Sequence, residues 1–141
     1  MIANQQKESN EKFEKVIING EEWEVISRYT RKQAIEDGVL VDLTKLFPND
    51  TRIFKYPVAC TSAVWSIIES ACNYTREDLG TYVWDLCWMS NKPLAIVKDE
   101  GHERLFKCQI PLGTREQLFK IHIGGGDALE PVITIMLPDE D

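Results

Sequence analysis

The last third of the chain constrains its fold most, because three β-prone segments follow one another there. These segments are Arg104–Ile110, Gln117–Ile123 and Val132–Leu137. The first two alternate apolar and polar residues, so one face of the sheet that they form should meet water. Strands and helices do not alternate regularly along the chain, as they do in a doubly wound sheet. The pattern therefore predicts an α+β fold with a mainly antiparallel sheet.

Two helices are predicted in the middle of the chain. The first has its N-cap at Thr61 and repeats apolar residues at the helical spacing. The second is expected to have its N-cap at Thr75, acidic residues in its first turn, and its end at Met89 or Ser90. Residues 82–89 of this helix are apolar on nearly every side. Such a helix is either buried or lines a groove that another molecule fills.

Short sequence patterns also predict local structure in the N-terminal part of the chain. Residues 1–14 are polar and charged, and we expect a flexible arm or a short helix there. The Asn19-Gly20 pair lies between two β-prone runs and predicts a hairpin. Thr30 and Gln33 have the spacing of a capping box, and they predict a short helix that Gly38 ends.

The remaining segments complete a one-domain arrangement. We expect a compact strand over residues 39–43 and an irregular segment over residues 44–55. A chain of 141 residues is most simply one domain. The sequence thus predicts a single α+β domain over residues 15–141, in which the sheet packs with two or three helices.

Composition narrows the classes of function. The net charge is −7, with the acidic excess spread thinly along the chain, which argues against broad nucleic-acid binding. No apolar stretch is long enough to span a membrane, and the N-terminus lacks the apolar core of a signal peptide. We therefore expect a cytoplasmic protein.

The spacing of the four cysteines favours a structural role over metal binding. Cys60, Cys72, Cys87 and Cys108 form no Cys-x-x-Cys pair, and the two histidines are not in ligand spacing with each other. We expect reduced thiols that pack as small apolar groups, no metal site and no cofactor.

A run of glycines raises the question of a phosphate-binding loop. Gly124-Gly125-Gly126-Asp127 is followed closely by Pro131 and a strand, which leaves no room for the helix that a P-loop needs. The favoured interpretation is a flexible hairpin loop whose glycines supply positive φ angles. A small-anion site built on Gly125 and Asp127 remains open as an alternative.

Several side chains are candidates for binding or catalysis. Trp84 and Trp88 lie one turn apart on one helix face, where they either fill the core or form an interaction hot spot. Asp85, between them, is either a general acid or base or the structural partner of an arginine, with Arg28 and Arg31 as candidates. Cys60, just before a helix, is either a nucleophile or a packing residue.

The chain also resembles a known group of sequences. It is similar to a family of small uncharacterised proteins encoded by phages, plasmids and other mobile elements. Residues 45–52 depart from the family pattern, and residues 1–20 lie outside it. The likeness covers residues 28–138 in four ordered blocks: Tyr29–Asp42, Lys55–Ala59, Thr61-x-x-Val-Trp65 with Trp84-Asp-x-x-Trp-Met89, and Gly126-Asp127 with Pro131–Pro138.

The resemblance implies a genetic setting and no reaction. Small proteins in that setting often antagonise host defences or tune conjugation and replication. We therefore expect a non-catalytic accessory protein that binds a host or element-encoded macromolecule, with a protein as the partner. Two alternatives stay open: a small-ligand or nucleotide-binding domain that uses the Gly124–Asp127 loop, and an enzyme that uses Cys60 or Asp85.

Overall fold

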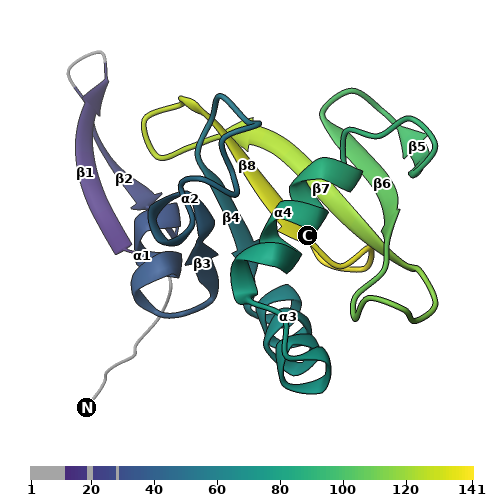
Figure 1. Cartoon of the computed structure of the whole chain (residues 1–141). Coiled ribbons are helices and arrows are strands. Elements are labelled where there is room, and N and C mark those ends of the chain that lie inside the picture. The colour runs from purple at the N-terminus through teal and green to yellow at the C-terminus, as the bar shows by residue number, and fades with distance from the viewer. Residues whose placement is uncertain (1–11, 19–20, 28) are drawn as a thin grey trace.

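The computed structural model describes residues 12–18, 21–27 and 29–141, which form one two-stranded sheet, one six-stranded sheet and four helices (Figure 1). This arrangement confirms the predicted α+β class. The elements are, in chain order, β1 (Lys12–Ile18), β2 (Glu21–Ser27), α1 (Arg31–Glu36), β3 (Leu40–Asp42), α2 (Leu43–Leu46), β4 (Val58–Thr61), α3 (Ser62–Thr75), α4 (Leu79–Met89), β5 (Ile96–Asp99), β6 (Glu103–Cys108), β7 (Gln117–Gly125) and β8 (Pro131–Met136).

The six-stranded sheet has the order β3-β4-β8-β7-β6-β5. Every neighbouring pair is antiparallel except β4 and β8, which run parallel. All four residues of β4 are buried, and this strand lies inside the sheet between β3 and β8. The sheet is therefore mainly antiparallel, as the sequence predicts.

The hydrophobic core lies between one face of this sheet and helices α3 and α4, which lie on the same side of it (Figure 1). Alternate residues of β6, β7 and β8 point into this layer, and the rings of Phe106 and Phe119 lie 5.9 Å apart within it. Burying each such side chain contributes about 1.5–3 kcal/mol. The core side of α4 consists of Tyr82, Val83, Leu86 and Cys87.

The opposite face of the sheet carries polar side chains. The strand register aligns five residues across it: Asp42, Ala59, Thr134, His122 and Glu103. Exposed Lys107 on β6 and Leu118 on β7 also lie outside the core cluster, in agreement with the predicted water-facing side. The sheet thus has one core face and one mixed, mostly polar face.

The C-terminal turn is fastened to this polar face. The Glu140 carboxylate accepts hydrogen bonds from the Thr61 hydroxyl and the Leu137 backbone N–H, both at 2.8 Å. The Glu140 carbonyl accepts from the ammonium of Lys120, which also lies 3.9 Å from the Glu103 carboxylate. These contacts explain how a lysine is buried in the middle of β7.

The local predictions near the N-terminus are mostly confirmed. β1 and β2 pair as an antiparallel hairpin, although its turn residues, 19–20, lie outside the described residues. The predicted arm over residues 1–14 is too long, because residues 12–14 belong to β1 and pair with β2; residues 1–11 are not described. The Thr30–Gln33 capping box is present, and Gly38 follows α1 with a φ of +79°.

Three elements were not predicted, and one cap was placed wrongly. Strands β4 and β5 are only four residues long, and α2 is a single turn inside the segment expected to be irregular. Thr75 does not cap α4 but ends α3, and the N-cap of α4 is Asp78. The Thr75 hydroxyl instead bonds the Ala71 carbonyl and the Tyr82 hydroxyl, and those contacts outcompete a capping role.

Candidate functional site

The outer face of α4 carries two stacked tryptophans. Trp84 and Trp88 stack on it with ring centroids 5.7 Å apart and an interplanar angle of 21°. Trp88 is 50% exposed, whereas Trp84 is partly buried. Asp85 lies beside them in the sequence and is also partly buried. We call Trp84, Asp85 and Trp88 the tryptophan face.

The tryptophan face is held from one side by residues 47–52. The Arg52 guanidinium lies 5.8 Å from the centroid of the Trp84 ring, within the range of a cation–π interaction. This segment packs close to the start of α4, where a β-carbon on Gly80 would lie 2.5 Å from the Asp50 carboxylate. Trp84 is therefore an anchored platform, and Trp88 extends that platform into solvent.

Asp85 adds a carboxylate to this platform. Burial raises the pKa of the Asp85 carboxyl, and the nearby Glu77 carboxylate raises it further. Within residues 29–141, no hydrogen bond or salt bridge to the Asp85 carboxylate is found. Among the described residues this partly desolvated carboxylate has no cation beside it, an environment that favours a positively charged partner.

The predicted pairing of Asp85 with Arg31 is wrong. The Arg31 guanidinium donates to the Thr134 hydroxyl and the Ile133 carbonyl, both at 2.7 Å, and so binds β8. Burial lowers the pKa of Arg31, and three neighbouring carboxylates oppose that shift. Arg28, the other candidate, lies outside the described residues.

Arg31, Gly125 and Asp127 do come together, at the start of α1. The Asp127 carboxylate accepts hydrogen bonds from the backbone N–H groups of Arg31 (2.8 Å) and Lys32 (3.1 Å). All three predicted residues line an open hollow of about 790 Å³. Because protein groups already satisfy the Asp127 carboxylate and the Arg31 guanidinium, this cluster fastens the glycine loop to α1.

The glycine loop is a turn, as predicted, but its glycines do not supply positive φ angles. The turn closes through a bond from the Gly126 N–H to the Glu130 carbonyl, and Leu129 adopts the positive φ of +66°. Gly126 is needed for close packing, since an added β-carbon would lie 2.6 Å from Glu130 Cδ and 2.9 Å from Val132 Cγ1. Gly125 has no contact closer than 3.7 Å.

The cysteines behave as core residues. Cys60, Cys87 and Cys108 are buried and free, and Cys72 is partly buried and free. Burial raises the pKa of the Cys60 thiol to about 12. A thiol that stays protonated and has no exposed surface cannot serve as a nucleophile, so Cys60 is a packing residue. In the described part of the chain no cluster of three His, Cys, Asp or Glu side chains could hold a metal ion.

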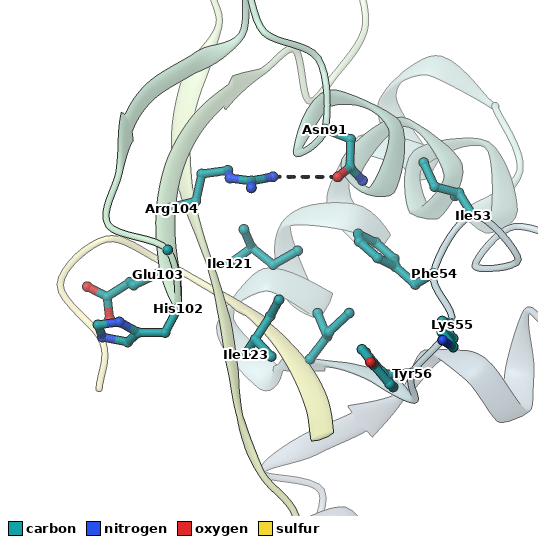
Figure 2. Close-up of a pocket in the computed structure, with 12 residues that line it drawn as sticks. Ile53, Phe54, Lys55, Tyr56, Asn91, His102, Glu103, Arg104, Ile121 and Ile123 are labelled. Carbon is teal, nitrogen blue, oxygen red and sulfur yellow. Dashed lines mark hydrogen bonds between the residues drawn. The ribbon is translucent and has the colours of Figure 1, made fainter. Parts of the chain in front are cut away.

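A second cavity was not foreseen from the sequence. It has a volume of about 250 Å³ and lies between the sheet and residues 53–56 (Figure 2). Figure 2 shows Ile121 and Ile123 on one side, Phe54 and Tyr56 on the other, and Arg104 reaching across toward Asn91. We call this cavity the isoleucine slot. No sequence motif marks it, because its walls come from segments far apart in the chain.

Comparisons of the chain with protein-family profiles, with curated proteins and with solved structures find no match. No helix among residues 12–18, 21–27 and 29–141 is both long and apolar enough to cross a membrane. The candidate site therefore rests on the geometry of α4 and its neighbours.

Proposed function

We propose that the protein is a non-catalytic binding protein whose tryptophan face contacts a partner protein. The half-exposed Trp88, stacked on the anchored Trp84, is the observation that carries this proposal. Tryptophan is enriched at the energetic centres of protein interfaces, and there it brings a large rigid surface at little entropic cost. The other side of α4 is fully buried, so the helix presents this surface on a rigid support.

The partner segment is basic. The chain carries a net charge of −7, and the Asp85 carboxylate, which has the Glu77 carboxylate near it, belongs to the tryptophan face. A lysine or arginine from the partner could lie over the Trp88 ring and pair with the Asp85 carboxylate at once. The cation–π contact contributes about 0.5–2 kcal/mol, and complementary charge speeds association.

The proposed setting is that of a mobile-element accessory protein that acts by occupying a host protein surface, for example one that belongs to a defence system. This part of the proposal rests on the resemblance of the ordered sequence blocks alone. A protein that acts by occupying another protein's surface needs a recognition surface and no set of catalytic residues, and the tryptophan face meets that need.

Photo-crosslinking tests the proposal. A photoreactive amino acid at position 88 should capture a basic protein in host cells, and the same residue at Tyr74 should not. Tyr74 is an aromatic side chain on α3 that is 75% exposed and lines a separate hollow with Ile67 and Pro111, which makes it a matched control. Capture should weaken with Asp85→Asn and with rising salt. Identical crosslinking profiles at positions 88 and 74 would contradict the proposal.

A further inference from the structure

The isoleucine slot has the walls of a ligand site. Ile121 and Ile133 form a buried floor, and half-exposed Ile123 stands at its opening. Phe54 and Tyr56 close the facing side (Figure 2). A mostly apolar concave site with few polar groups is the usual form of a small-molecule pocket. Its volume of about 250 Å³ is slightly below the usual range for drug-sized ligands, so the occupant is small.

One end of the slot offers an unused hydrogen-bond donor, the Nη2 atom of Arg104. Arg104 Nη1 donates to the Ser90 carbonyl at 2.8 Å and lies 3.5 Å from Asn91 Oδ1. Arg104 Nε is buried and makes no hydrogen bond, although it lies 3.2 Å from Asp99 Oδ2. Among the described residues no acceptor binds Nη2. Nε has almost no accessible surface and faces Asp99, so a ligand cannot reach it. Nη2 is not among the buried unpaired atoms, and a ligand in the adjoining cavity can supply the acceptor that it lacks.

The charges around Arg104 favour an uncharged ligand. The positive charge of the Arg104 guanidinium is already neutralised by the Asp99 carboxylate, because Nε and Asp99 Oδ2 lie 3.2 Å apart, at the distance of an ion pair. An additional carboxylate would therefore meet Asp99 as well as the arginine, in a chain that is already acidic. A neutral acceptor, such as a carbonyl oxygen, takes the free N–H groups without that repulsion.

We propose that the isoleucine slot binds a small, uncharged, mostly apolar molecule that carries one carbonyl group, with the carbonyl oxygen accepting from Arg104. This site shares no lining residue with the tryptophan face and does not depend on the function proposed for it. For a probe of this size, the dissociation constant should be on the order of 1 mM.

Three probes of matched size test the ligand class: acetophenone has a neutral carbonyl, benzoate a carboxylate, and ethylbenzene no acceptor. Titration followed by two-dimensional ¹H–¹⁵N NMR should show acetophenone shifting the amide signals of Phe54, Ile121 and Ile123. Acetophenone should bind at least about fivefold more tightly than either other probe. No saturable shift at these amides, or equal binding of benzoate or ethylbenzene, would overturn the proposal.

A matched pair of variants tests the location. Ile123→Trp should fill the slot and abolish acetophenone binding, because Ile123 is 42% exposed at the opening and the larger side chain can be accommodated. Leu118→Trp is the control: this residue is on the same strand, 41% exposed, and on the other face of the sheet. Its variant should bind like the wild type. Undiminished binding by Ile123→Trp would overturn the assignment, and the shift map of the wild type decides the question if that variant does not fold.

Discussion

Removing the Asp127 carboxylate should loosen the attachment between the glycine loop and α1. This side chain accepts hydrogen bonds from two N–H groups in the first turn of the helix, at 2.8 and 3.1 Å. A comparable N-cap contact contributes about 0.5–2 kcal/mol, and a negative charge near a helix start about 0.3–1 kcal/mol. Thr30 keeps its own cap in the variant. We therefore expect Asp127→Ala to lower the free energy of unfolding by about 1–2 kcal/mol.

Urea unfolding of three variants separates hydrogen bonding from charge. Asp127→Asn keeps an acceptor oxygen but loses the charge, so its loss should be intermediate; salt should reduce the losses of both Asp127 variants by a similar amount, because both lack the charge. Asp139→Ala changes the net charge by the same amount at an exposed position, and it should stay within about 0.5 kcal/mol of the wild type. Amide exchange at Arg31 and Lys32 should accelerate only in the Asp127 variants. Equal stability of Asp127→Ala and Asp139→Ala would refute the capping role.

Three further outcomes are expected. Gly126→Ala should cost about 1–3 kcal/mol in urea unfolding through overpacking, whereas Gly125→Ala, which has room and no positive φ, should cost far less; equal losses would contradict the packing argument. Tyr82→Phe should cost about 1–3 kcal/mol in the same assay, because it leaves the Leu112 N–H without its acceptor; an unchanged midpoint would count against that bond. Burial raises the pKa of three thiols to about 12 in the folded chain. Above the ordinary thiol pKa the unfolded chain therefore loses protons that the folded chain keeps. The free energy of unfolding should fall as pH rises from about 9 toward 12. Replacing these thiols with alanine should flatten that fall; the three residues are Cys60, Cys87 and Cys108.

Local signals in the sequence predicted those parts of the fold that neighbouring residues determine. The Thr30–Gln33 capping box, the end of α1 at Gly38 and the β1–β2 hairpin each depend on residues a few positions apart. Strand β4 could not be found in this way, because it is short and its place depends on parallel pairing with β8, far along the chain. The glycine loop was predicted as a turn with the wrong backbone geometry, since Leu129 takes the positive φ.

For the candidate sites too, local spacing could locate residues along the chain, but contacts between distant segments could not be predicted. Trp84 and Trp88 could be placed on one helix face from their spacing alone, but only the structure shows which side of α4 is buried. The partners of Arg31 lie more than a hundred positions away in the sequence. No local pattern could therefore show whether Arg31 contacts β8 or Asp85. The isoleucine slot is invisible in the sequence for the same reason.

The stability of Trp88→Ala sets the reference for testing the tryptophan face. A fully buried aromatic side chain removes about 150–250 Å² from water, so half-exposed Trp88 buries roughly 100 Å². At about 25 cal/mol per Å² this burial contributes at most about 2.5 kcal/mol, and the alanine retains part of it. We expect a loss of about 1–2 kcal/mol without a cavity, against about 2–5 kcal/mol for Leu86→Ala in the core.

The most direct test is to measure, for Trp88→Ala, both the free energy of unfolding and the affinity for the basic protein captured at position 88. Titration calorimetry should show binding weakened by about 2 kcal/mol or more, which corresponds to roughly thirtyfold, while the folded fraction under assay conditions stays complete. Tyr74→Ala should bind like the wild type. Unchanged affinity in Trp88→Ala, or a stability loss as large as that of Leu86→Ala, would show that Trp88 supports the fold and does not recognise a partner.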